Sequence, residues 1–287
     1  MKRIVRNEKK FIGINLLFNI LVSIFCLILA IFSISANVFN VQNILSSQEI
    51  SLTVNKEKVV ISSFSTDYSK SPDNRKFNIR LALKSLNNQV VKAGEEFSFN
   101  KVVGERTEER GYKKALVIFK GSYTEGVGGG VCQVSSTLYN AWLLAGLDVV
   151  SVRAHTLPAS YVEVSRDATV SEVIDLKLKN SLQTDVIIKT EYDDKSIMIK
   201  IEGEEREYNY SLKSEILEVV PFGEDIVEVD EEGEDEYYIG KDGYVSRLVI
   251  TISKGDKVIA RRVLRKDHYK PQNSVRIIRK PQLNQIT

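Results

Sequence analysis

The chain has 287 residues, of which 43% are hydrophobic and 27% are charged, so it has the composition of a globular protein with room for one large or two smaller domains. Residues 1–10 hold five cations and one anion, and the rest of the chain carries 35 cations and 37 anions. Because this remainder is nearly neutral and has no basic stripe, we do not expect nucleic-acid binding.

The N-terminal region has the pattern of a membrane anchor. Residues 11–48 contain no charged residue, and residues 11–32 are almost entirely apolar. A helix of about 20 apolar residues crosses the hydrocarbon core of a bilayer, and cations on one side keep that side in the cytoplasm. The pattern predicts cytoplasmic residues 1–10, a transmembrane helix over 11–36 and an extracytoplasmic C-terminal domain in a single-pass cell-membrane protein. A cleaved signal peptide is the alternative.

The residues after the predicted anchor are expected to form a connector and then the first strand, helix and hairpin of the main domain. Residues 37–62 are expected to form a juxtamembrane connector and a first strand, and residues 64–75 a polar loop. Apolar residues at helical spacing predict a helix that Asp73 caps and that ends at residues 87–88. Alternation over residues 90–99 predicts a hairpin.

Short apolar runs in the following part predict strands with little helix between them. Together they favour a mixed or antiparallel sheet and the α+β class, with one domain over residues 63–203 and a C-terminal β-rich unit over 204–287. An acidic run at 224–236 is expected to be a solvated loop or sheet edge. The predicted strands cover residues 115–119, 149–152, 174–178, 184–190, 196–202, 244–253 and 257–264.

Cys132 is the only cysteine outside the predicted anchor, so a disulfide scaffold is excluded. A lone cysteine is most often a small buried hydrophobe, but this one follows three glycines and begins a helical pattern that ends near Gly146. The unpaired N–H groups of a first helical turn stabilise a thiolate and can hold an oxyanion. The predicted oxyanion or substrate loop comprises Gly128, Gly129, Gly130, Gln133 and Ser135.

A base for this thiol is available in the chain. His155 lies 23 residues after Cys132, past the predicted helix and one strand, and an antiparallel return can bring it to the helix start. His268 is expected at the surface. The pair predicts nucleophilic catalysis by Cys132 with His155 as the base. The residue that orients His155 stays open among Asp167, Asp175, Ser160 and Tyr161.

Other kinds of site are less well supported. Arg153 and Arg166 are candidates for binding a substrate carboxylate, and solvated surface positions explain them equally well. Two ligands are too few for zinc, and no Lys-Ser or Lys-Thr follows the glycines as a P-loop requires. We therefore expect no metal and no cofactor, and the oligomeric state cannot be predicted.

Residues from about 64 to 180 resemble a VanW domain, and residues 240–278 resemble the β unit that often follows such domains. The segment with the glycines and the cysteine is long and specific. The matching pieces are FSTDYS at 64–69, NRKFNI at 74–79, AGEEFSFNKVVGERTEERGY at 93–112, GGGVCQVSSTLYNAWLLAGL at 128–147, AHTLPASYV at 154–162 and RDATV at 166–170.

This resemblance implies a function in the cell wall. Some VanW-domain proteins are L,D-transpeptidases that form 3-3 cross-links between peptidoglycan stem peptides through a thioester on the motif cysteine, a role that would fall on Cys132 with His155 beside it. The chain departs from other L,D-transpeptidases in lacking a Ser-His-Gly-Cys run, and from the family in having Thr156 after the histidine. Water as acceptor would give a carboxypeptidase. The alternative is a non-catalytic peptidoglycan-binding or accessory protein linked to the glycopeptide response.

Overall fold

The computed structural model describes residues 23–25, 27–35, 38–39, 57–119, 122–224, 226–230 and 236–279, and the chain divides into two units, residues 1–57 and 58–287. The described residues of the first unit are helical up to residue 39.

The transmembrane helix that was expected as part of the fold is wrong. Among the described residues, no helix is both long enough and apolar enough to span a membrane. The predicted single-pass localisation, which depended on this anchor, is wrong as well. Residues 11–22, 26 and 36 of the predicted span, and the predicted cytoplasmic residues 1–10, lie outside the described residues.

The main sheet of the second unit is antiparallel and has the strand order β1-β9-β8-β2. Alternate residues of β9, Ile197, Ile199 and Ile201, are fully buried, as the period of two in a half-buried strand requires. Helix α2 packs against β8. These elements are β1 (Val59–Asp67), α2 (Asp73–Leu86), β2 (Gln89–Val91), β8 (Val186–Tyr192) and β9 (Ser196–Gly203).

Two smaller sheets complete this part of the fold. One has the order β3-β7-β6 and the other is the β4-β5 hairpin. The predicted hairpin over residues 90–99 is wrong, because β2 pairs with β8 and β3 pairs with β7. The predicted polar loop starts too early, since residues 64–67 belong to β1. The remaining elements are β3 (Glu96–Ser98), α3 (Phe99–Val103), β4 (Lys114–Phe119), β5 (Ser122–Val127), β6 (Asp148–Ser151) and β7 (Lys177–Lys179).

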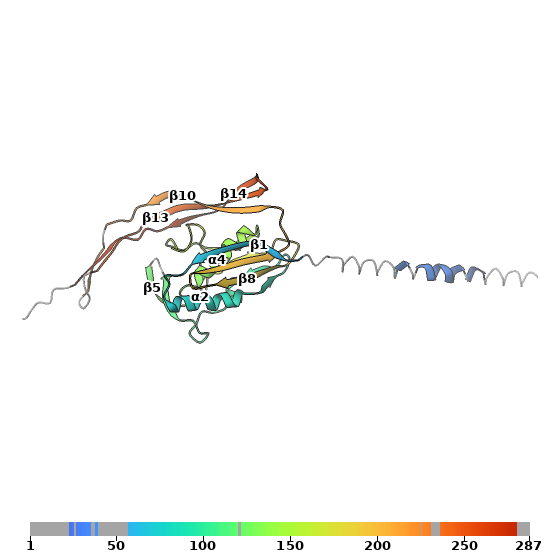
Figure 1. Ribbon diagram of the computed structural model, residues 1–287, viewed down its shortest axis with the longest axis horizontal. Coiled ribbons are helices and arrows are strands. Elements are labelled where there is room, and N and C mark those ends of the chain that lie inside the picture. Colours follow the sequence, from blue (N-terminus) through green and yellow to red (C-terminus); the bar gives the residue numbers. More distant parts are fainter. Residues whose placement is uncertain are drawn as a thin grey trace, which may run out of the picture. The chain divides into compact units, whose positions relative to one another are not determined.

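Helix α4 (Val131–Leu144) is buried along nearly its whole length. It contacts β1 and β9 of the main sheet and β10 of the C-terminal region, and Figure 1 shows it enclosed between these layers. Its sequence mixes apolar residues with serine, threonine, glutamine and asparagine, and these polar side chains are buried as well, so each needs a partner inside the protein. The predicted helix after the glycines is therefore present, and it forms the centre of the core.

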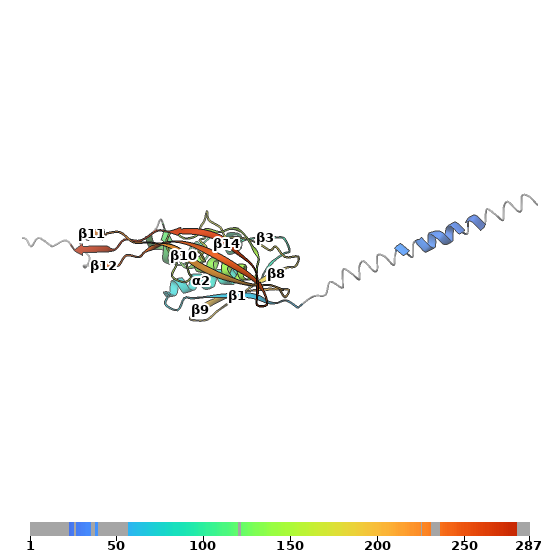
Figure 2. The same cartoon turned by 90° about the horizontal axis from the view of Figure 1, so that it is seen from above.

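The C-terminal region is made of strands, and the whole fold is α+β with more sheet than helix. Figure 2 shows its long strands β10 and β14 side by side with β13 along one face of the unit. The second sheet, β11-β15-β12, contains part of the acidic run as its edge strand β11. The strands are β10 (Asn209–Val220), β11 (Ile226–Asp230), β12 (Glu236–Tyr238), β13 (Gly243–Lys254), β14 (Lys257–Tyr269) and β15 (Val275–Arg279).

Candidate active site

The glycine loop before α4 is built for close packing. Gly130 has φ +105°, which side chains disfavour, and a Cβ there would lie 2.9 Å from Arg75 Cγ. A Cβ on Gly129 would lie 2.7 Å from two backbone oxygens of β4, those of Ala115 and Leu116. Only glycine fits at these two positions, and the loop thereby holds the start of α4 against β4 and α2.

Cys132 occupies the second position of α4 with its backbone N–H directed to no protein acceptor. The N–H of Val131 donates to Gly128 O at 3.2 Å, and that of Gln133 donates to Gly130 O at 2.9 Å. Within the described part of the chain, the N–H of Cys132 has no such partner. The N–H beside the partly buried sulfur is therefore available to stabilise an oxyanion.

The loop between β6 and β7, residues 152–176, is attached to α4 by a polar stripe. Four residues of helix rise about 6 Å, close to the roughly 6.6 Å of two extended residues, so every fourth helix position can meet every second loop residue. Three contacts join them: Cys132 Sγ to Val170 O at 3.4 Å, Ala168 N to Ser136 Oγ at 2.9 Å and Asn140 Nδ2 to Arg166 O at 2.7 Å.

This register turns Asp167 away from α4 and toward His155. Asp167 Oδ2 lies 2.6 Å from His155 Nδ1 and accepts the backbone N–H of His155 at 2.6 Å. The imidazole is also close enough to Cys132 for hydrogen bonding and charge to act between them. The three side chains therefore follow one another in the order that a nucleophile, a base and an orienting acid would require.

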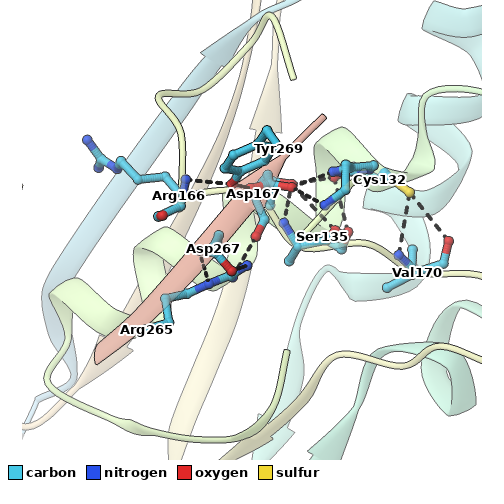
Figure 3. A network of polar contacts seen from close by, with 12 residues as sticks. Cys132, Ser135, Arg166, Asp167, Val170, Arg265, Asp267 and Tyr269 are labelled. Atoms are coloured by element: carbon cyan, nitrogen blue, oxygen red, sulfur yellow. Dashed lines mark hydrogen bonds and ion pairs between the residues drawn. The ribbon is translucent and has the colours of Figure 1, made fainter. Parts of the chain in front are cut away.

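The C-terminal strand β14 holds the acid of this group in place, as Figure 3 shows. Tyr269 donates its hydroxyl to Asp167 Oδ1 at 2.5 Å, and Arg265 donates to the backbone oxygen of Asp167 at 2.9 Å. Arg265 is itself fixed by two contacts of 2.8 Å with Asp267. Burial and the charge of Asp167 raise the pKa of Tyr269, which keeps this phenol protonated as a donor.

The electrostatics of the site favour an ion pair of thiolate and imidazolium. Burial acts to raise the pKa of the Cys132 thiol, but hydrogen bonding and charge from His155 outweigh it and lower this pKa below its ordinary value. Burial acts to lower the pKa of His155, but Asp167 and Cys132 together raise it to about 10. The pKa of Asp167 is lowered, because contacts with His155 outweigh the effect of burial. The thiolate is the reactive form of cysteine.

Several predicted site residues lie elsewhere. The side chains of Gln133 and Ser135 are fully buried and donate to core acceptors, Thr66 Oγ1 at 2.9 Å and Ala168 O at 2.6 Å, so they cannot line a substrate loop as expected. Asp175 binds the start of α3 instead of a histidine.

The predicted arginines, and all the remaining candidates except Asp167, also lie outside the group formed by Cys132 and His155. Arg153 and Ser160 are exposed. Arg166 donates to Asn140 Oδ1 at 2.7 Å and lies over the ring of Phe64, so it is held by the protein itself. His268 is exposed on β14, as expected for a surface residue. Of the four candidates for orienting His155, the contact is made by Asp167.

Arg75 and Arg106, near Cys132, do not stand out in the sequence, and Tyr161 does so only as a candidate for orienting His155. Burial, followed by the charge of Cys132, raises the pKa of Tyr161 well above its ordinary value. The charge of Arg106 acts to lower the pKa of Cys132, and Arg75 lies over the ring of Tyr161 at 5.9 Å from its centroid. The spacing of Cys132, Ser136 and Asn140, each four residues after the last on a buried helix, is the signal that would have located the loop.

Comparison with known proteins identifies similar sequences. Residues 74–202 match the family model described as VanW like protein. The uncharacterized protein YoaR of Bacillus subtilis (strain 168) is 44% identical over 137 residues, 47% of this chain and 45% of YoaR. The vancomycin B-type resistance protein VanW of Enterococcus faecalis (strain ATCC 700802 / V583) is 35% identical over 132 residues, 44% of this chain and 48% of that protein. The chain thus spans about half the length of the curated relatives it matches.

Among solved structures, the crystal structure of HP0197-G5 is similar over 25% of this chain and 99% of its own, with 19% identity and a TM-score of 0.15.

Proposed function

The chain belongs to the VanW-like family, and on that premise we propose that it is a cysteine-dependent acyltransferase of the L,D-transpeptidase type that acts on peptidoglycan stem peptides. The observation that carries the proposal is the contact between His155 and Asp167 at 2.6 Å beside Cys132, whose pKa is lowered. The name of the enterococcal relative links that protein to vancomycin resistance. The stem peptide as substrate comes from the family resemblance.

In the first half of the proposed reaction, the Cys132 thiolate attacks the carbonyl carbon of the scissile amide. The carbonyl oxygen becomes an oxyanion, which the backbone N–H of Cys132 stabilises. The C–N bond then breaks, and the imidazolium of His155 gives its proton to the departing amine. The products are a thioester on Cys132, a neutral imidazole and, from a tetrapeptide stem, free D-alanine.

In the second half, an amine of a neighbouring stem attacks the thioester. The neutral imidazole of His155 takes a proton from this amine, a new amide forms and the thiolate leaves. Asp167 stabilises the imidazolium at the start and end of the cycle without itself becoming protonated. Water in place of the amine would give hydrolysis through the same residues.

A product assay tests the proposal. The protein is incubated with disaccharide-tetrapeptide, beside a Cys132→Ala variant whose fold is checked by circular dichroism, and the products are identified by mass spectrometry. We expect cross-linked dimer and released D-alanine from the unmodified protein and neither from the variant. Tripeptide without dimer would identify a carboxypeptidase, and no product from the folded protein would contradict the enzyme and favour the peptidoglycan-binding alternative.

The pKa values predict an unusual pH dependence of the thiol. The thiolate forms as pH rises through the lowered pKa of Cys132, and the imidazolium persists until pH passes the His155 pKa of about 10. The pH dependence of the rate of Cys132 alkylation by iodoacetamide should therefore have its midpoint below the pKa of about 8.5 of a free cysteine. A His155→Ala variant should move the midpoint up to that value or above. A midpoint near 8.5 in the unmodified protein would contradict the ion pair.

A further inference from the structure

Two arginines lie against the glycine loop without a carboxylate partner. Cβ atoms placed on Gly130 and Gly128 would lie 2.9 Å from Arg75 Cγ and 2.7 Å from Arg106 Cβ. Both arginines are partly buried. In the part of the chain that the structure describes, neither forms an ion pair with an acidic side chain. Because a cation withdrawn from water is costly until it is paired, an anionic ligand would be bound favourably there.

Arg75 is the freer of the two. Arg106 donates to a side-chain amide oxygen and a backbone oxygen at 2.9 and 3.1 Å. The guanidinium of Arg75 donates to one neutral acceptor, Ser71 Oγ at 2.5 Å. Most of the donors of Arg75 are therefore available to a ligand, in the planar arrangement that matches a carboxylate.

Tyr161 contacts both Arg75 and helix α4, which carries Cys132. Arg75 lies over the Tyr161 ring, and the phenol of Tyr161 interacts with Ser136, one helical turn after Cys132. The charges of Arg75 and Cys132 also act on each other. An anionic group bound by Arg75 would thus lie near a carbonyl carbon attacked by Cys132.

We propose that Arg75, supported by the ring of Tyr161, binds the free C-terminal carboxylate of the peptide whose scissile bond Cys132 attacks. This inference rests on the proposed acyl transfer and adds the residue that recognises the terminal carboxylate of the substrate. The carboxylate of such a residue lies about one residue, roughly 3.8 Å, beyond the scissile bond. A longer peptide has a neutral amide there and cannot form the charge-assisted pair.

The test measures binding without turnover. Iodoacetamide alkylation of Cys132 is followed by mass spectrometry of the Cys132 peptide, in the full chain, with N-acetyl-D-alanine or N-acetyl-D-alaninamide as the protecting ligand. We expect the carboxylate to protect at concentrations at least about 10-fold lower than the amide, as a bidentate charged pair implies. In Arg75→Met, which keeps the packing stem, this preference should fall to within about 2-fold.

Arg106→Met is the matched control, since it also removes a cation beside the glycine loop. It should change the alkylation rate but keep the preference for the carboxylate. No preference in the unmodified protein, an unchanged preference in Arg75→Met, or an equal loss in both variants would overturn the assignment. If Arg75→Met fails to fold, Arg75→Lys keeps the charge without the fork and should lose part of the preference. A preference that persists while the product assay is negative would refute the acyltransferase and leave the carboxylate site intact.

Discussion

Replacing Asp167 with asparagine is expected to lower kcat/KM for acyl transfer by about 10³–10⁴-fold while the protein stays folded, the loss found when the acid that orients a catalytic histidine becomes an amide. Asp167 Oδ2 accepts two N–H groups of His155, and Oδ1 accepts the hydroxyl of Tyr269. Asparagine has the same shape, but it lacks the charge that raises the pKa of His155. Steady-state kinetics with the disaccharide-tetrapeptide provides the measurement.

Tyr269→Phe is the control for this variant. It removes one hydrogen bond to Asp167 and leaves the charge in place. The expected loss is about 10-fold, since a hydrogen bond to a charged group contributes roughly 1.5 kcal/mol. If kcat/KM of Asp167→Asn stayed within 10-fold of that of the unmodified protein, His155 would not depend on the Asp167 carboxylate. The proposed orienting role of Asp167 would then be wrong.

Gly129→Ala should lower the free energy of unfolding by about 2–3 kcal/mol, the cost of forcing an added methyl group into a packed interior. The new Cβ would lie 2.7 Å from the oxygens of Ala115 and Leu116. Both atoms are backbone, so relief requires β4 or the loop to move. Such a shift would also displace the start of α4 and slow alkylation of Cys132. Urea denaturation monitored by circular dichroism measures the first effect.

Gly223→Ala serves as the comparison. Its added Cβ would first meet the exposed side-chain end of Asn273 at 3.2 Å, which has to shift only slightly and accepts the N–H of Gly223 at 2.9 Å. We expect a loss below about 0.5 kcal/mol, as for surface substitutions in general. Equal stability losses in the two variants would show that the glycine loop tolerates a side chain and that its packing is not restrictive.

Elements specified by local patterns could be predicted from the sequence. The helices predicted near Asp73 and after the glycines are present as α2 and α4, and the strands predicted over residues 184–190 and 196–202 are present as the paired strands β8 and β9. The predicted cap is wrong, because Asp73 is the first residue of α2 and, among the described residues, no side chain caps that helix. The hairpin over residues 90–99 failed because alternation predicts a strand but does not specify its partner. The partner of β3 is β7, about 80 residues along the chain.

In the candidate site, too, only the residues that stand out locally could be predicted from the sequence. Cys132 and His155 stand out by composition, because each is rare and lies beside special backbone residues. The choice of Asp167 over Asp175 depends on the register of the loop on α4, which only the three-dimensional contacts provide. Tyr269 lies 102 residues from Asp167, so no local pattern connects them.

The similarity to the family model ends at residue 202, whereas two supports of Asp167 come from β14, at Arg265 and Tyr269. The segment recognised by sequence similarity is thus smaller than the segment that the proposed chemistry requires. A C-terminal sheet that packed differently on the same loop would reset the acidity of the thiol without altering any residue between 74 and 202. The C-terminal sheet would thereby act on the acidity of Cys132 in addition to packing beside the core.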